Sequence, residues 1–343
     1  MGILAVVVNQ QQKNMAGGDE DKGKNQEAKQ SQRKPSIFDT PPAMKFSQVI
    51  SSDNKRDFAM GILAHLGTQS LSVTIQAPLE RIKILLQVQH VHKGIHAKER
   101  FKGTINCASK IIKNQGIISF FRGNQVELVK VPIHEYLHVM IPPIFKKVIV
   151  TADIKKERKR YFFEAWLSGL AETATYLILL YPLDVLRVRV ATDIGYKRQR
   201  EYRGSLDCFR TILRNDGFQG LFSGFSCQAS GMLLQRSFSY AFFTTAKAAG
   251  LFETDRLTLQ FALAMFLSFA SEALTYPFAV IMKRMMLQAG HGTGRLFKNP
   301  IDCLKMTLQR EGPRGLYRGY LLSVFITFNR FLVTSVLEGT SIL

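Results

Sequence analysis

The chain repeats one pattern three times, and this repetition constrains its fold more than any other feature. Each copy contains a cysteine preceded by Asn or Asp; one glycine follows nine residues later, and a second follows after seven more. The second glycine ends an aromatic-x-Gly triplet, and a proline precedes the cysteine by 26 or 29 residues. The landmarks are Pro78, Cys107, Gly116 and Gly123; Pro182, Cys208, Gly217 and Gly224; and Pro277, Cys303, Gly312 and Gly319. We therefore expect three copies of one structural unit, at 52–150, 151–252 and 253–343.

Each unit contains two apolar stretches, one before the proline and one after the triplet. The stretches before the prolines span 58–77, 162–181 and 259–276. A helix of about 20 apolar residues crosses the hydrocarbon core of a bilayer, so the six stretches predict six membrane-crossing helices. The segments around the cysteines, such as 205–215, predict short amphipathic helices on one membrane face.

Ionisable residues interrupt these stretches, among them Glu172, Glu272, His134 and Arg236. Such residues inside a bilayer face protein or water. For Glu172 and Glu272, a proton or ion relay, an inter-helix hydrogen bond and a contact to a partner subunit all remain open.

Lysine and arginine total 46 in the 343 residues, against 26 acidic residues, a formal net charge of +20. That charge suits an anionic membrane, an anionic ligand or nucleic acid. The absence of any aromatic-basic module excludes nucleic acid as a partner. The four cysteines form no CxxC pair, and no nucleophile–base pair, metal-ligand spacing or glycine-rich phosphate loop is present. We predict neither catalytic residues nor a metal site, and no cofactor apart from bound lipid.

Residues 1–51 form a low-complexity extension. From Asn9 to about Lys45 the sequence is polar and offers little to bury, so ordering it would cost more entropy than its contacts return. The apolar start, Met1 to Val8, is too short to cross a membrane and lacks the cationic region of a secretory signal.

Two hexapeptides point to a known family. Pro78-Leu79-Glu80-Arg81-Ile82-Lys83 and Pro182-Leu183-Asp184-Val185-Leu186-Arg187 resemble the Pro-x-[Asp/Glu]-x-x-[Lys/Arg] signature of mitochondrial carriers. Ala77–Gln89 and Lys283–Gln288 are similar to stretches of the ADP/ATP carriers within that family. The resemblance implies an all-α membrane protein of the mitochondrial inner membrane: a threefold pseudo-symmetric bundle of six transmembrane helices, with three short helices on the matrix face.

The resemblance also implies a ring of inter-repeat ion pairs that closes the matrix side. Projected here, Glu80 should pair with Arg187, whereas Met282 and Ala279 replace the partners of Asp184 and Lys83. We therefore expect Asp184 and Lys83 to be unpaired, which is costly in a partly buried ring. The second ring, at the opposite end, keeps only Lys247 and Glu338.

Similarity to the ADP/ATP carriers implies a nucleotide site inside the bundle. The matching phosphate-binding positions hold Val73, Lys130 and Ile326, so two of three cations are missing. Gly231 and Met232 match the adenine-binding pair, Arg236 is retained, and Arg330 is a candidate substitute cation one turn after Ile326. The predicted substrate contacts are Lys130, Gly231, Met232, Arg236 and Arg330.

The lipid-facing motifs are better preserved. Glycines that precede or follow the short helices resemble cardiolipin clamps, in which phosphates lie on helix N-termini: Gly103, Gly123, Gly204, Gly224 and Gly319. The third repeat has Asn299 where the first two have Gly103 and Gly204. Bound cardiolipin is therefore expected.

Two functions follow from these departures. The eroded gates and phosphate contacts favour a transport-impaired, carrier-fold protein that serves as a structural subunit of a larger inner-membrane assembly, such as a respiratory complex or ATP synthase. The alternative is an active antiporter of ADP/ATP or a related anion. Pro142 and Pro143 are expected to disrupt the helix that contains them, and this corner and the N-terminal extension are the predicted partner contacts.

Overall fold

The computed structural model describes residues 55–95, 97–151, 157–195, 200–251, 257–291, 294 and 296–340. The predicted N-terminal extension lies outside these residues. Within the described part, the elements are helices and turns, with no strand. Six helices are long: α4 (Lys55–Val88), α6 (Asn124–Ile149), α7 (Arg158–Thr192), α9 (Phe225–Ala248), α10 (Leu257–Leu287) and α12 (Tyr320–Thr340).

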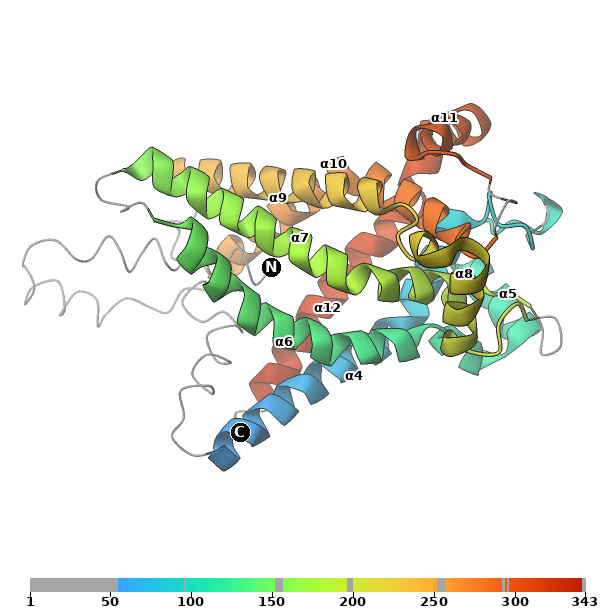
Figure 1. Ribbon diagram of the computed structural model, residues 1–343, viewed down its shortest axis with the longest axis horizontal. Coiled ribbons are helices and arrows are strands. Elements are labelled where there is room, and N and C mark those ends of the chain that lie inside the picture. Colours follow the sequence, from blue (N-terminus) through green and yellow to red (C-terminus); the bar gives the residue numbers. More distant parts are fainter. Residues whose placement is uncertain are drawn as a thin grey trace, which may run out of the picture.

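In each repeat a shorter α-helix lies in the chain between the two long helices: α5 (Thr104–Gln115), α8 (Ser205–Gly220) and α11 (Pro300–Glu311). Short 3₁₀ segments accompany them: η1 (Ala97–Glu99), η2 (Ile117–Phe121) and η4 (Pro313–Tyr317). Figure 1 shows that α5, α8 and α11 gather at one end of the molecule, on the right. We call this the short-helix end.

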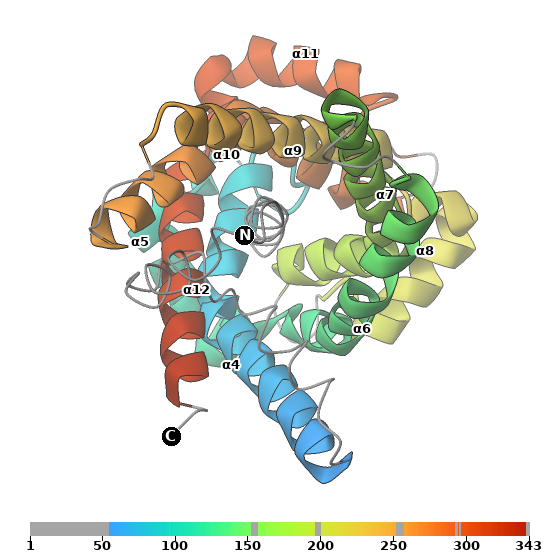
Figure 2. The ribbon, with the colours of Figure 1, turned by 90° about the vertical axis from the view of Figure 1, so that its left-hand side faces the viewer.

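The six long helices form a closed ring. Along the chain α4 packs against α6, α6 against α7, α7 against α9, α9 against α10, and α10 against α12; α12 then packs against α4. Figure 2 shows the helices in this order around a common centre. The last long helix therefore completes the ring beside the first.

The long helices that open each repeat continue through their prolines. Pro78, Pro182 and Pro277 lie inside α4, α7 and α10. The expectation that Pro142 and Pro143 disrupt their helix is wrong, because α6 continues past both to Ile149. Each proline removes one backbone hydrogen-bond donor. α6 remains helical through both prolines because it packs along α7 and α4.

The three repeat cysteines occupy equivalent buried positions. Cys107, Cys208 and Cys303, in α5, α8 and α11, are each 0% exposed. Cys208 and Cys303 join the large apolar cluster with Tyr181 and Met282, and Cys107 packs with Leu85. Burial raises the pKa of all three thiols to about 12. These cysteines attach the short helices to the ring, and their chemistry is that of small buried apolar side chains.

A second repeated contact joins the two long helices of a unit. Tyr181, just before Pro182, donates a hydrogen bond to the carbonyl of Ser223 (2.6 Å). In the third repeat Tyr276 donates equivalently to the carbonyl of Arg318 (2.9 Å). Both carbonyls belong to the middle residue of the aromatic-x-Gly triplet. The triplet thus positions the start of α9 and α12 against α7 and α10.

One described helix segment, Ala262–Leu287 in α10, is long and apolar enough to cross a membrane by length and composition alone. The other long helices have large apolar side chains on their outer surfaces and ionisable side chains between helices. The exposed apolar residues include Leu71 and Ile75 of α4, Val129 and Ile133 of α6, Ile178 and Leu179 of α7, Leu233 and Leu234 of α9, and Leu321 and Phe325 of α12.

Candidate functional site

Charged side chains from five long helices meet inside the ring, toward the short-helix end. We call this group the charge cluster: Glu80, Lys83, Glu127, Lys130, Asp184, Arg187, Lys283 and Arg330. The five cations and three carboxylates leave a formal excess of two positive charges. The two signature hexapeptides supply four of the eight residues because each places a carboxylate and a cation one turn apart.

Glu80 is the most connected carboxylate of the charge cluster. Its carboxylate oxygens lie 2.9 Å from the nitrogen of Lys83 on the same helix, 3.6 Å from a nitrogen of Arg330 on α12 and 3.9 Å from a nitrogen of Arg187 on α7. Its side chain is 10% exposed, and three nearby cations offset the cost of burying the carboxylate. The predicted pair of Glu80 with Arg187 is therefore confirmed. It forms part of a larger group that spans all three repeats.

The expectation that Asp184 and Lys83 are unpaired is wrong. Lys130 of α6 reaches Asp184 of α7, with Nζ and Oδ1 2.5 Å apart, and Lys83 turns back to Glu80 on the preceding turn of α4. Lysine has a long, flexible stem, so each ammonium finds a carboxylate other than the one that strict threefold symmetry assigns. Lys130, predicted to contact substrate phosphate, is engaged in this ion pair.

Arg187 makes a second contact that the signature does not suggest. Its Nη1 lies 3.0 Å from Oε2 of Glu127 on α6. Glu127 lies one turn before Lys130, so both face α7. That spacing is the one sequence signal that could have identified Glu127, which the sequence analysis missed.

The junction between the second and third repeats differs from the other two. Met282 stands where a cation would meet Asp184, and it is buried in the apolar cluster with Leu186 and Met285. Lys283, the next residue, lies within electrostatic reach of Glu80 and Asp184. Within the described residues, ion pairs join the first repeat to each of the others, whereas the second and third are joined by apolar packing and by hydrogen bonds such as that from Asn215 to the carbonyl of Gly290.

Arg330 lies where the sequence places a substitute cation. Its side chain is 54% exposed, and its Nε donates to Oε1 of Gln76 at 2.9 Å. Ile326, one turn earlier, is 2% exposed, and Val73 is partly buried. Arg330 is thus an accessible cation one turn after Ile326, and it is hydrogen-bonded to Gln76, one turn after Val73.

The predicted adenine contacts are partly involved in helix packing. A side chain on Gly231 would meet Cβ of Phe278 at 2.8 Å, so this glycine permits the close approach of α9 and α10. Met232 packs beside the same apolar cluster. Arg236 of α9 interacts electrostatically with Glu172 of α7. The structure does not bring these three residues into contact with Lys130 or Arg330.

At the opposite end of the ring, Lys247 and Glu338 lie in α9 and α12, and their side chains are outside the described ones.

Glu272 of α10 accepts a hydrogen bond from the hydroxyl of Ser323 on α12 (2.6 Å). For Glu272 the structure therefore shows the inter-helix hydrogen bond that the sequence left as one of three alternatives.

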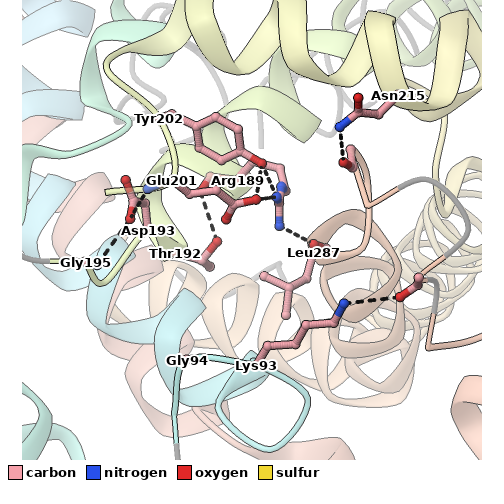
Figure 3. A network of polar contacts seen from close by, with 12 residues as sticks. Lys93, Gly94, Arg189, Thr192, Asp193, Gly195, Glu201, Tyr202, Asn215 and Leu287 are labelled. Carbon is pink, nitrogen blue, oxygen red and sulfur yellow. Dashed lines mark hydrogen bonds and ion pairs between the residues drawn. The ribbon is translucent and has the colours of Figure 1, made fainter. Parts of the chain in front are cut away.

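A separate polar network lies at the short-helix end, where α4, α7 and α10 finish. Figure 3 shows Arg189 directed toward Glu201, the Tyr202 hydroxyl and the Leu287 carbonyl. Nearby, Lys93 donates to the carbonyl of Gly294 (3.3 Å) and so links the first repeat to the third.

A cavity of about 540 Å³ adjoins this network and is lined by residues of all three repeats. Burial lowers the pKa of His92 and of His291, both on its wall. His92 Nε2 donates to the carbonyl of Thr192 (2.9 Å).

The N-termini of the short helices share one arrangement. The backbone N–H of Lys102, Arg203 and Lys298 each donates to a side-chain oxygen four residues later, from Asn106, Asp207 and Asp302. Gly103 and Gly204 precede α5 and α8 without a side-chain cap, and a Cβ at either would meet nothing within 4 Å. Open space beside uncapped N–H groups is a suitable place for a phosphate.

The other three predicted lipid glycines have a packing role. Gly123, Gly224 and Gly319 have positive φ, from 79° to 85°. A Cβ on Gly224 would lie 2.8 Å from Cβ of Met285, and one on Gly123 would lie 3.0 Å from the carbonyl of Arg187. These glycines allow α9 and α6 to start against the neighbouring helices.

Comparison with known proteins identifies three consecutive matches to the family described as "Mitochondrial carrier protein", at residues 54–153, 158–251 and 253–339. ADP/ATP translocase 3 of Bos taurus is 33% identical over 268 residues, which cover 76% of this chain and 89% of that protein. ADP/ATP translocase 2 of Rattus norvegicus is 33% identical over 274 residues (78% and 91%). The mitochondrial substrate carrier family protein ancA of Dictyostelium discoideum is 34% identical over 254 residues (73% and 82%).

Proposed function

Because this chain belongs to the mitochondrial carrier family, we propose that it is an antiporter of adenine nucleotides or related phosphate-bearing anions in the mitochondrial inner membrane. As a member of a transporter family, it is a carrier and not an enzyme. The family match and the similarity to ADP/ATP translocases confirm the family that the signature hexapeptides predicted.

In this proposal all six long helices cross the membrane, arranged with threefold pseudo-symmetry, and the short-helix end faces the matrix. The apolar outer surfaces of the long helices support the membrane-crossing arrangement, since a transmembrane helix places apolar side chains toward lipid and ionisable ones toward the interior. The charge cluster, which lies toward the short-helix end, is then the matrix gate.

The observation that carries the proposal is the set of substitute ion pairs in the charge cluster. A carboxylate from one repeat meets cations from the other two at Glu80, and Lys130 compensates Asp184. An arriving phosphate competes with Glu80 and Asp184 for these cations and so loosens the contacts between repeats. The two excess positive charges favour an anionic substrate over a cationic one.

The missing cations at Val73 and Ile326 favour a second candidate, the transport-impaired structural subunit. Each lost charge-assisted contact to phosphate weakens binding by about 1.5–3 kcal/mol. On this alternative the chain binds a larger inner-membrane assembly, and the charge cluster only holds the helices together. Asp184 and Lys83 are both paired, so they do not support this candidate.

Reconstitution separates the two candidates. The purified full chain is placed in cardiolipin-containing liposomes loaded with ADP, and uptake of labelled ADP, ATP and inorganic phosphate is measured. We expect exchange by the unmodified chain, a fall of more than about tenfold in Arg330→Gln, from the loss of a phosphate contact, and no change in Arg214→Gln, which alters an exposed arginine of α8.

Two other results would favour the structural candidate. One is uptake only after the Val73→Lys/Ile326→Arg double substitution. The other is no uptake by any variant, together with stoichiometric retention of the chain in a respiratory or ATP-synthase complex in mild detergent.

Cardiolipin is proposed as a bound lipid at the N-termini of α5 and α8. Support comes from the uncapped N–H groups beside Gly103 and Gly204 and from the adjacent cations Lys102 and Arg203. In the third repeat the helix starts with Asn299 and Pro300, which leaves one N–H fewer for a phosphate.

A further inference from the structure

Arg330 of α12 is the most exposed of the ion-paired cations in the charge cluster. The side chains of Lys83, Lys130 and Arg187 are 13%, 18% and 19% exposed, and each lies within 3.0 Å of a carboxylate oxygen. The side chain of Arg330 is 54% exposed, and its Nη2 lies 3.6 Å from Oε1 of Glu80. At that distance the ion pair is not a hydrogen bond. Arg330 is therefore the cation of this group that an arriving anion reaches most easily.

Gln76 of α4 holds Arg330 in this position. Nε of Arg330 donates to Oε1 of Gln76 at 2.9 Å. Gln76 is only 1% exposed, and its own Nε2 donates to Oγ of Ser72 at 3.0 Å. Because both ends of the amide are occupied, its orientation is fixed. The two Nη groups of Arg330 make no hydrogen bond to a described residue, so they are the donors that remain for a ligand.

Apolar side chains flank this contact on both helices. Val73 lies one turn before Gln76 on α4, and Ile326 lies one turn before Arg330 on α12, so each shares a helix face with its neighbour. Ile326 is 2% exposed and Val73 is partly buried. Neither side chain can donate a hydrogen bond to a phosphate oxygen. At this contact between α4 and α12 the described side chains therefore offer a phosphate one guanidinium.

The formal charge of the whole cluster suits an anion with two negative charges. Its five cations exceed its three carboxylates by two. A phosphate group bears a charge of about −1.5 to −2 at pH 7, which the excess balances. A second or third phosphate would bring further negative charge close to Glu80 and Asp184, and an uncompensated charge in a membrane interior is costly.

We infer that Arg330 and Gln76 form a binding site for a single phosphate group, and that the carrier therefore prefers a phosphate dianion to di- and triphosphates. The two Nη groups of Arg330 donate to two oxygens of the phosphate, the paired geometry that guanidinium favours. The dianion comes from a nucleoside monophosphate or from inorganic phosphate, and the tests below distinguish these sources. This inference rests on the proposed antiport and specifies the substrate class of the same site.

The neutral amide explains how Gln76 acts as a positioning residue. A carboxylate beside Arg330 attracts the guanidinium and competes with phosphate for it, as Glu80 does. The amide of Gln76 carries no charge, so its hydrogen bond to Nε persists when phosphate occupies the two Nη groups. Phosphate can then displace Glu80 while α4 continues to hold Arg330 in place.

The first test ranks substrates by exchange kinetics. The full chain in cardiolipin-containing liposomes exchanges phosphate, AMP, ADP or ATP, each supplied labelled outside against the same compound inside. We expect KM for ATP to be about tenfold or more above the lower of the values for AMP and phosphate, because the extra phosphates lack charge-assisted contacts. A lower KM for AMP assigns a nucleoside monophosphate, and a lower KM for phosphate assigns the inorganic ion. Similar KM values for all four anions, or the lowest value for ATP, would overturn the preference.

The second test examines Gln76. Gln76→Leu keeps a side chain of similar size and removes the acceptor for Nε of Arg330, so KM for the preferred anion should rise several-fold with little change in maximal rate. Gln76→Glu adds a competing charge and should raise KM further. Gln309→Glu, at an exposed position of α11, adds the same charge and should leave KM unchanged. A lower maximal rate with unchanged KM in both Gln76 variants would mean that Gln76 only packs between helices.

A substitution that adds a charge keeps the inference testable if the Gln76 variants fail to fold. Val73→Lys places a second cation one turn before Gln76. It should lower KM for ADP several-fold relative to KM for AMP, because the second phosphate then has a partner. Gln309→Lys adds the same charge on α11 and should leave this ratio unchanged. An unchanged ratio in Val73→Lys would show that phosphate does not bind at this contact.

A binding test does not depend on transport. The unfolding temperature of the detergent-solubilised chain is measured with equal concentrations of phosphate, AMP, ADP or ATP, since a ligand that binds the folded state raises it. Phosphate or AMP should raise it more than ATP, and Arg330→Gln should abolish the gain. If this order holds but no anion is exchanged, the antiport fails and the phosphate site stands. If exchange occurs and ATP stabilises the chain as much as the others or more, the inference fails and the antiport stands.

Discussion

At the scale of single residues, the ion pair between Lys130 and Asp184 joins α6 to α7 within the charge cluster. Their side chains are 18% and 26% exposed, so solvent screens the pair only in part. Lys130→Met leaves the carboxylate without its closest partner, and we expect a loss of about 1–3 kcal/mol in stability. Thermal unfolding in detergent measures this loss.

A double substitution tests the same pair more sharply. Lys130→Met/Asp184→Leu removes both charges, and an apolar pair of similar size should recover most of the stability. Arg160→Met, in an exposed pair on α7, should leave the unfolding temperature unchanged. If the double variant is as unstable as the two single losses added together, the two residues act independently and the pair has no role in holding α6 to α7.

The repeat cysteines provide a pH-dependent prediction. Burial raises the pKa of Cys107, Cys208 and Cys303 to about 12, so about one thiol in ten thousand is ionised at pH 8. Because the thiolate is the reactive form, maleimide labelling should be very slow in the folded protein and complete after denaturation. Labelling is followed by mass spectrometry. Rapid labelling of the folded chain at pH 8 would contradict the buried placement.

The residues of the charge cluster show where sequence reasoning stops. The signature located Glu80, Lys83, Asp184 and Arg187, because a carboxylate and a cation at fixed spacing after a proline share one helix face. Apart from the Glu80–Arg187 pair, their partners could not be assigned, since Lys130 and Arg330 reach the cluster from α6 and α12 on long side chains. Symmetry assigns each charge one partner, whereas Glu80 has three.

At the scale of elements, the glycines before α9 and α12 offer a matched comparison. Gly224 and Gly319 occupy equivalent positions in their repeats and have similar φ, 83° and 79°. A Cβ at Gly224 would meet Cβ of Met285 at 2.8 Å, whereas the nearest atom to one at Gly319 is the hydroxyl oxygen of Tyr276 at 3.3 Å. Gly319→Ala should cost mainly the left-handed strain, about 1–2 kcal/mol. Gly224→Ala should cost clearly more, because α9 must move away from α10.

Thermal unfolding of both variants checks this prediction. Equal losses would mean that α9 has room to shift and that Gly224 serves backbone conformation only. Labelling of Cys227, in the first turn of α9, provides a second measurement, since displacement of α9 should expose it in Gly224→Ala and not in Gly319→Ala.

The repeat landmarks predicted most elements because each landmark has a local physical cause. The cysteine marks the buried face of a short helix, and the two glycines mark positive-φ turns at its end and before the next long helix. The effect of Pro142 and Pro143 was not predictable in this way. Whether a proline ends a helix depends on what packs beside it, and α6 is held by α7 and α4.

At the scale of the whole molecule, the net charge of +20 predicts strong dependence on anionic lipid. Cardiolipin should raise the unfolding temperature of the solubilised chain, through phosphates at the N-termini of α5 and α8. Gly204→Asp distinguishes this site from general attraction. An aspartate there caps α8 and stabilises the lipid-free protein by a few tenths of a kcal/mol relative to glycine, yet it repels phosphate.

We therefore expect Gly204→Asp to have a higher unfolding temperature without cardiolipin and a smaller gain when cardiolipin is added. Gln309→Glu is the control, since it adds the same charge at an exposed position of α11 away from that helix N-terminus. If both variants show equal gains, the lipid acts through overall charge, and the proposed site beside Gly204 is excluded.

The closure of the ring by α12 has a consequence for how the protein is made. Arg330 and Gln76 join the final long helix to the opening one, so the circle stays incomplete while the ribosome is still translating the third repeat. A chain cut short before Arg330 would leave α4 without its last neighbour and an apolar seam open to the surroundings. Proteases that degrade misfolded proteins should remove such fragments. The protein should therefore accumulate only when its last helix is intact.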